Sequence, residues 1–131
     1  MNKKILDVLE YDKIKQSIRQ FIATENGTKE LRELVPSSDE TEVRNALKQT
    51  LDAVNIYRLK NGIPVPRLED VTEALQRLKI DAALNGQELA QIGRILRATR
   101  TVINFFDDLE SEEIEIVALD QVIEQLVTIP E

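Results

Sequence analysis

Several side chains that commonly carry chemistry are missing from this sequence. Its 131 residues contain no cysteine, no histidine and no tryptophan. Without cysteine the chain can form neither a disulfide nor a thiolate metal site, which fits a reducing compartment and leads us to expect a cytoplasmic location. Without histidine it lacks the commonest general base and metal ligand. We therefore expect no catalytic residue, no bound cofactor and no metal in this chain.

Glycine and aromatic residues are also scarce. The four glycines stand singly, so the chain has neither a glycine-rich phosphate loop nor a dinucleotide-binding turn. Aromatic residues make up 4% of the chain and hydrophobic residues 42%, which predicts an aliphatic core. The length suits one domain over residues 1–131. No run approaches the ~18 consecutive apolar residues of a membrane span, so a membrane is not an expected partner.

Cations are absent from the last 31 residues, which carry nine carboxylates between Asp107 and Glu131. All 17 lysines and arginines lie in the first 100 residues, where 15 acids oppose them. The net charge of −7 therefore belongs to the tail, and the body is nearly neutral. Because nucleic-acid binding needs Lys and Arg to neutralise phosphates, any such contact must come from before residue 101.

The first 60 residues predict four helices. Asn2 can cap the first helix and Asp12 the second, and residues 26–27 are expected to interrupt the pattern before a third. Asp39 and Glu42 have the spacing of a capping box, which predicts a long helix from residue 38 or 39. The residues expected to face inward on this helix are Val43, Leu47, Thr50, Leu51, Val54 and Tyr57.

Two prolines in three residues, Pro64 and Pro66, predict a loop over residues 61–68. A helix is expected over residues 69–79, and the pattern is expected to stop near Asn85. Three apolar residues of this helix should face inward, namely Val71, Leu75 and Leu78.

The clearest helical spacing follows, at intervals of three and four: Leu89, Ile92, Leu96, Thr99, Ile103 and Phe106. This stripe is wide enough to be covered by more than one neighbour. Gly93 lies within it, where glycine costs about 1 kcal/mol relative to alanine, and close helix packing is its expected reason. Residues 112–116 alternate polar and apolar and could form a short strand-like piece, whereas helical spacing returns between Leu119 and Leu126.

These patterns predict an all-α fold. We expect an irregular helical bundle with two long helices and several short ones, in which consecutive helices pack antiparallel and strand content is close to zero.

Five cations are the candidate nucleic-acid contacts: Arg94, Arg97, Arg100, Arg77 and Lys79. The three arginines at intervals of three lie on neighbouring turns and could meet phosphates with their planar guanidinium groups. Alternatively, these cations form ion pairs within the chain, with Glu73, Asp81 or the acidic tail. The adjacent acids of the tail, such as Asp107 and Asp108, point in different directions on a helix and predict a solvated acidic end.

Several blocks of sequence occur in a fixed order: residues 1–14 (MNKKILDVLEYDKI), 34–37 (LVPS), 63–64 (IP), 68–71 (LEDV), 84–89 (LNGQEL) and 96–100 (LRATR). As a set they resemble the bacterial MutS-two family, the MutS paralogues that carry a C-terminal Smr domain. Members usually have a glycine pair after the proline of the central loop, where this chain has Val65, Pro66 and Arg67.

The resemblance implies a longer parent polypeptide, of which this chain is the N-terminal helical core or lever domain, similar to that of MutS. That domain would join an ATPase to a nucleic-acid clamp. The parent would bind ATP and Mg²⁺, form a homodimer, bind DNA and ribosomal RNA, act as an endonuclease through the Smr domain, suppress recombination and help to rescue collided ribosomes. The ATPase, clamp and Smr signatures do not occur in these residues.

A second interpretation remains open. The chain could be a free-standing acidic helical adaptor that binds partner helices along an exposed apolar groove.

Overall fold

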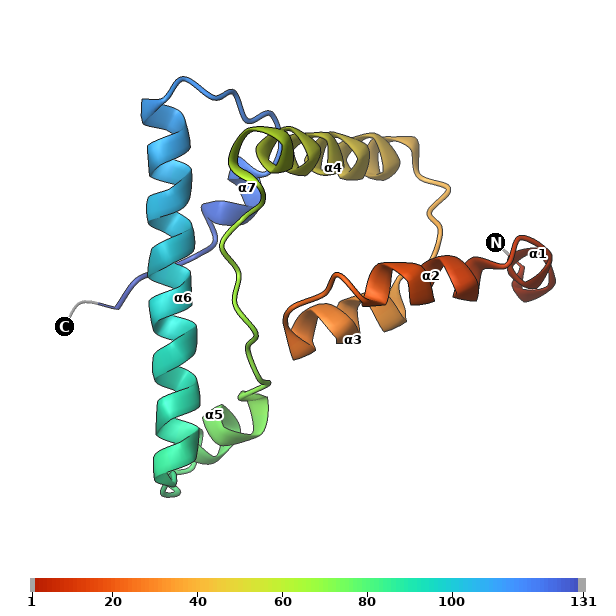
Figure 1. Cartoon of the computed structure of the whole chain (residues 1–131). Coiled ribbons are helices and arrows are strands. Elements are labelled where there is room, and N and C mark those ends of the chain that lie inside the picture. Colours follow the sequence, from red (N-terminus) through yellow and green to blue (C-terminus); the bar gives the residue numbers. More distant parts are fainter. Residues whose placement is uncertain (1, 130–131) are drawn as a thin grey trace.

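Residues 2–129 are described in the computed structural model of this chain, and they form helices joined by loops (Figure 1). The helices are α1 (Lys3–Val8), α2 (Tyr11–Arg19), α3 (Glu25–Glu33), α4 (Glu40–Lys60), α5 (Thr72–Lys79), α6 (Gly86–Ser111) and α7 (Asp120–Ile123). Within the described residues β-pairing is limited to a parallel bridge between Thr24 and Leu68. The all-α prediction is confirmed, whereas residues 112–116 form a turn and a loop rather than a strand-like piece.

The first two helices begin differently from each other. The Asn2 side chain accepts the Lys4 N–H at 2.7 Å, so Asn2 caps α1 as predicted. The predicted cap of α2 is wrong, because Asp12 lies in its first turn and the N-cap is Glu10. Glu10 adopts a left-handed backbone with φ of 55°, which turns the chain sharply between the two helices.

α3 includes the residues that were expected to interrupt the helical pattern. Thr24 caps it by accepting the Gly27 N–H at 2.9 Å. Residues 26–27 therefore lie in the first turn of α3, because Thr24 satisfies an amide that the helix leaves unpaired.

Both long helices have side-chain caps. Asp39 accepts the Glu42 N–H at 3.0 Å, as predicted. The Glu42 carboxylate bonds to the Ser37 hydroxyl and not to the Asp39 N–H, so the capping box is incomplete. Asn85 forms a complete capping box with Glu88 and starts α6. The pattern break at Asn85 is thus the beginning of α6, whereas α5 already ends at Lys79.

The helices form an open frame (Figure 1). α2 and α3 pack as an antiparallel pair, in keeping with the predicted arrangement. The two long helices do not lie side by side, because the connection after α4 runs extended to α5 and α6 returns past the end of α4. Pro64 and Pro66 favour this extended connection. The prediction that consecutive helices pack antiparallel therefore fails for α4 and α5, which this extended connection separates.

The main core lies where α4 meets the C-terminal half of α6. Its buried residues are Ile56 of α4 and Val102, Phe106 and Leu109 of α6. Partly buried residues close over them from the loops and α7: Ile63, Phe105, Ile114, Ile116, Leu119 and Ile123. Phe105 and Phe106 meet edge to face with their centroids 5.6 Å apart. The core is aliphatic apart from these two rings.

The side chains predicted to face inward on α4 are exposed instead. Leu47 is 63% exposed and Tyr57 65%, whereas Asp52 and Ile56 on the opposite face are buried. The physical reason is a polar one, since Asp52 binds backbone amides of the chain that follows α6 and so turns its own face of α4 inward.

Packing on α5 and α6 also departs from the predicted stripes. Val71 is buried as predicted, but Leu75 and Leu78 are exposed, and Ala74 is buried in their place. Leu96 is 39% exposed, so the double-sided packing expected around it is wrong. The neighbouring helices are divided between the two ends of α6, with α5 beside its start and α4 and α7 beside its C-terminal half (Figure 1). Burial on α6 concentrates towards its C-terminal end.

Candidate functional site

Asp52 anchors the chain that follows α6. It is 2% exposed, and its carboxylate accepts the N–H groups of three successive residues: Val117 at 3.0 Å, Ala118 at 2.7 Å and Leu119 at 2.9 Å. Burial acts to raise the pKa of Asp52, but these N–H groups outweigh burial and hold its pKa below the ordinary value. A buried carboxylate that accepts three backbone N–H groups has a structural role.

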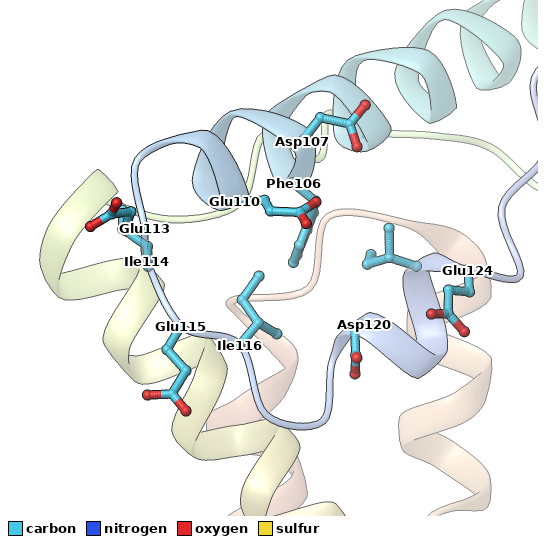
Figure 2. A pocket seen from close by; sticks show the side chains of 10 residues that line it. Phe106, Asp107, Glu110, Glu113, Ile114, Glu115, Ile116, Asp120 and Glu124 are labelled. Atoms are coloured by element: carbon cyan, nitrogen blue, oxygen red, sulfur yellow. The ribbon is translucent and has the colours of Figure 1, made fainter.

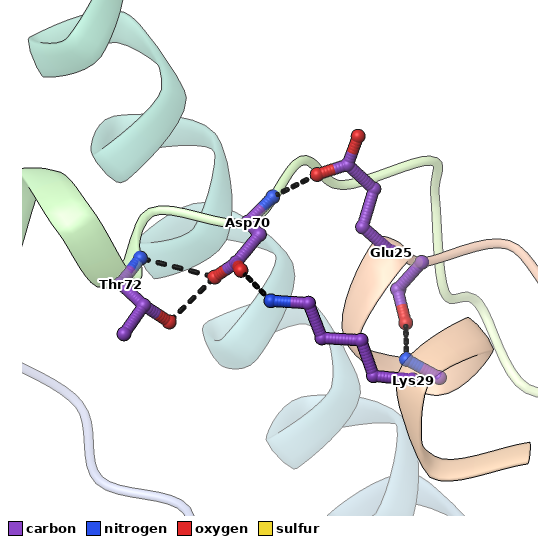
Figure 3. A network of polar contacts seen from close by, with 6 residues as sticks. Glu25, Lys29, Asp70 and Thr72 are labelled. Atoms are coloured by element: carbon purple, nitrogen blue, oxygen red, sulfur yellow. Dashed lines mark hydrogen bonds and ion pairs between the residues drawn. The ribbon is translucent and has the colours of Figure 1, made fainter. Parts of the chain in front are cut away.

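A second polar cluster ties α3 to the chain before α5 (Figure 3). Asp70 forms an ion pair with Lys29 and accepts the N–H and hydroxyl of Thr72 at 3.0 and 2.6 Å. The Asp70 N–H donates to the Glu25 carboxylate at 2.6 Å, and the Glu25 N–H donates to the Leu68 carbonyl at 3.0 Å. The Lys29 ammonium and the Thr72 donors hold the pKa of Asp70 well below its usual range, and the Asp70 carboxylate raises the pKa of Lys29.

An acidic hollow of about 510 Å³ lies between the end of α6 and α7 (Figure 2). Its floor is apolar and includes Phe106 and Ile116, which also close the core. Its rim carries six carboxylates: Asp107, Glu110, Glu113, Glu115, Asp120 and Glu124. These side chains are exposed, as the prediction of a solvated acidic end requires. Among the described residues, no group of three or more acidic side chains is placed to hold a metal ion.

The five candidate cations all lie on exposed positions of α5 and α6. Arg77 forms an ion pair with Glu88, and an Arg94 Nη atom lies 3.3 Å from a Glu69 carboxylate oxygen. Arg100 donates to the Ile129 carbonyl at 3.3 Å. The ion pairs thus use Glu88 and Glu69 rather than the predicted Glu73 and Asp81. These acids are nearer because α6 begins beside Arg77 and the chain before α5 passes Arg94.

The arginines of α6 do not form a straight row. Residues three apart on an α-helix are offset by roughly 60° around its axis, so Arg94 and Arg100 are offset by roughly 120°. The arrangement is a spiral of positive charge with Arg97 at its middle. A nucleic-acid role for the five cations remains a prediction.

Gly93 lies beside this spiral without the close helix packing expected there. A Cβ atom built on it would meet Arg97 Nη1 at 3.6 Å, which is ordinary van der Waals contact. No neighbouring helix occupies that position in the described part of the chain, so close packing is not the reason for this glycine.

The fold and these clusters define an open, all-helical module in which buried and clustered polar groups hold helices together. No helix within residues 2–129 combines the length and apolar content needed to cross a bilayer.

Comparisons with known proteins identify the family to which this helical module belongs. No family model matches the chain. Among curated proteins, it is 98% identical over its whole length to the endonuclease MutS2 of Pediococcus pentosaceus, 50% identical to that of Latilactobacillus sakei and 46% identical to that of Levilactobacillus brevis. The chain belongs to the MutS2 family, which confirms the resemblance found in its sequence. It spans 17% of the length of each of these relatives.

Proposed function

We propose that this chain is the N-terminal core or lever domain of a MutS2-type polypeptide and links its ATPase mechanically to its nucleic-acid clamp. Two observations support this function. The chain accounts for 17% of the length of its relatives, so much of such a polypeptide is available to contact it. Large apolar side chains are also exposed on most of the described helices, among them Ile14, Leu47, Tyr57 and Leu89. Apolar surface of this extent usually marks an interface.

In this proposal the chemistry belongs to the rest of the polypeptide. The relatives are named endonucleases. As the family resemblance implies, the parent would bind ATP with Mg²⁺, dimerise, bind DNA and ribosomal RNA in the cytoplasm, suppress recombination and rescue collided ribosomes. This chain itself would be no enzyme. Its part is to pass movement between the ATPase and the clamp.

A mechanical link needs at least one stiff joint. The junction of α4 and α6 provides it, because Leu109 and Ile56 are almost fully buried there and Asp52 bonds the returning chain to α4. Close-packed interiors transmit displacement because they deform little. The joint thus lies about the C-terminal end of α6 and not around Leu96.

The test uses the full-length relative from Pediococcus pentosaceus. Leu109→Ala should preserve ATP hydrolysis in the absence of nucleic acid and weaken the effect of nucleic acid on that rate, because the joint loosens. Leu96→Ala is the matched control on the same helix and should leave this coupling unchanged. Normal coupling in a Leu109→Ala protein whose domain is measurably destabilised would refute the mechanical role.

Direct contact with nucleic acid by the α5 and α6 cations is a second part of the proposal. Their exposure on one half of the frame favours it. Replacing Arg94, Arg97 and Arg100 together by glutamate in the full-length protein should abolish salt-sensitive binding to DNA or RNA. Unchanged affinity at low salt would reject these residues as contacts.

The free-standing adaptor remains the alternative function, and the exposed apolar residues of α4 favour it as well. Sequencing the open reading frame past Glu131 separates the two. A phosphate loop and an Smr domain downstream support the lever, whereas an immediate stop codon supports the adaptor.

A further inference from the structure

α4 buries a stripe with one carboxylate and one aliphatic side chain, and it leaves an apolar stripe exposed. The inward stripe includes Asp52 and Ile56. On the opposite face five exposed residues recur at intervals of four, three, four and three, and we call them the α4 seam: Val43, Leu47, Thr50, Val54 and Tyr57. Buried amphipathic helices normally have the reverse arrangement, with the apolar stripe covered.

The spacing of the α4 seam indicates what covers it. Apolar residues at alternating intervals of three and four are typical of knobs-into-holes packing, in which side chains of one helix insert between those of another. The seam spans 15 residues, from Val43 to Tyr57, and is roughly 21 Å long at the rise of an α-helix. Four turns of exposed apolar surface match the face of a helix of similar length.

The charges beside the seam specify the occupant further. Three exposed cations flank it, namely Arg44, Arg58 and Lys60, whereas Lys48 lies one turn before Asp52 on the opposite face. The acid between residues 43 and 60 is Asp52, which is buried on that opposite face and bonded to backbone amides. Arg44 and Lys60 already form ion pairs with Glu40 and Glu112, but exposed pairs of this kind are weak and exchange readily.

A second copy of α4 is a poor occupant, because its flanking arginines would face those of the first. Like charges beside a helix–helix seam oppose pairing, whereas opposite charges select the partner. An occupant with glutamate or aspartate beside its apolar stripe would complement Arg44 and Arg58.

We infer that the α4 seam receives an acidic-flanked amphipathic helix from the remainder of the same polypeptide. This inference rests on the proposed function, in which the chain continues into a protein of the relatives' length. Since the chain spans 17% of those relatives, most of their length lies outside it and can supply such a helix. A helix within the same polypeptide also docks at a high effective concentration.

The absence of cysteine from this chain allows a direct test by thiol labelling. Leu47→Cys and Val54→Cys are introduced one at a time into the full-length Pediococcus pentosaceus relative, and labelling of the peptide that carries the new cysteine is followed by mass spectrometry. Leu59→Cys is the matched control, because Leu59 lies on α4 outside the seam and is 59% exposed, close to the 63% of Leu47. Each variant is compared with itself unfolded in urea.

Both seam cysteines should label at least about tenfold more slowly in the folded protein than in urea, since a docked helix must open before they react. The Leu59→Cys control should label at nearly the unfolded rate. Rapid labelling of both seam cysteines in the folded protein would overturn the inference. Protection that disappears on dilution would also overturn it, because the cover would then be another molecule.

A charge reversal tests the acidic flank. Arg58→Glu should speed the labelling of Val54→Cys, because Arg58 lies one turn along α4 and the reversed charge would repel the docked helix. Lys79→Glu on α5 makes the same change of charge away from α4 and should have no effect. Equal labelling in both double variants would overturn the acidic character of the partner. Protected seam cysteines together with normal coupling in Leu109→Ala would leave the docking intact and remove the lever function.

Discussion

The carboxylate of Asp52 accepts the backbone N–H of Ala118 at 2.7 Å, joining two residues that are 66 positions apart in the sequence. Val117 and Leu119 donate to the same carboxylate. One short side chain therefore fixes the path of the chain between α6 and α7 against α4.

Replacing this acceptor should weaken the fold. Asp52→Asn presents an amide in place of a carboxylate and cannot accept all three donors with a full charge. We expect the free energy of unfolding to fall by about 2 to 4 kcal/mol, because buried N–H groups lose a charged acceptor. Urea denaturation near neutral pH measures this loss. Glu115→Gln, on an exposed residue of the same segment, serves as the control, and equal losses in the two variants would contradict the assignment.

The same residue predicts a loss of stability in acid. The pKa of Asp52 in the folded chain lies below the ordinary 3.8, so its contribution to stability is present above the unfolded pKa and is lost as the pH falls through the folded pKa. Unfolding measured between about pH 5 and pH 2 should therefore show a steeper decline in the parent chain than in Asp52→Asn. Parallel pH profiles would show that Asp52 does not contribute in this way.

Two leucines of α6 should differ sharply when truncated. Leu109 has 0% exposure and lies in the core, whereas Leu96 is 39% exposed. Leu109→Ala should cost about 2 to 5 kcal/mol in the 131-residue chain, the usual range for emptying a packed leucine site. Leu96→Ala should cost less than about 1.5 kcal/mol, since little of a cavity forms. Chemical denaturation measures the free energy of unfolding of both variants. A larger loss for Leu96→Ala would contradict the placement of the core.

Two glycines should respond in opposite ways to alanine. A Cβ atom at Gly27 would meet Ile22 Cγ2 at 2.9 Å and Thr24 Oγ1 at 3.0 Å, whereas one at Gly93 would meet only Arg97 Nη1, at 3.6 Å. Gly93→Ala should raise the melting temperature, because alanine is favoured over glycine in a helix by about 1 kcal/mol. Gly27→Ala should lower it through the clash. Calorimetry compares the two, and a stabilising Gly27→Ala would show that α3 shifts freely.

The cluster around Asp70 should control local opening of the N-terminal helices. Asp70→Asn keeps an acceptor for Thr72 but removes the charge that pairs with Lys29. Hydrogen exchange at the Glu25 amide, which donates to the Leu68 carbonyl, should become faster because the two segments separate more often. Glu10→Gln removes the exposed pair with Lys13 and should leave this amide unchanged. Equal exchange in both variants would contradict the role of the cluster.

Local sequence rules were enough to predict the all-α class and several helix starts. Asn2 and Asp39 cap helices as their residue types suggest, since capping depends on neighbours within a few positions. Asn85 shows the limit of this reasoning. The same Asn-Gly pair that punctuates a pattern also begins the longest helix, and the Glu88 three positions later was the available signal.

Packing was much harder to predict, because it depends on contacts between distant residues. The apolar spacing of α4 is real, but it does not reveal whether this chain or another segment covers it. The inward face of α4 is set by the hydrogen bonds between Asp52 and the amides of residues 117–119. No local sequence pattern predicts this pairing, because the partners are far apart in the sequence. The ion pairs of Arg77 and Arg94 follow in the same way from where the chain before α5 and the start of α6 happen to pass.

The Thr24–Leu68 bridge and the polar cluster beside it affect the order in which parts of the molecule unfold. They join α3 to the chain before α5 mainly through exposed polar contacts, whereas the α4–α6 junction is closed by buried aliphatic side chains. Denaturant should consequently melt the amino-terminal third first and the junction later, in two transitions of unequal size. A single denaturation midpoint does not then describe this chain, and each substitution is read from the transition of the part that carries it.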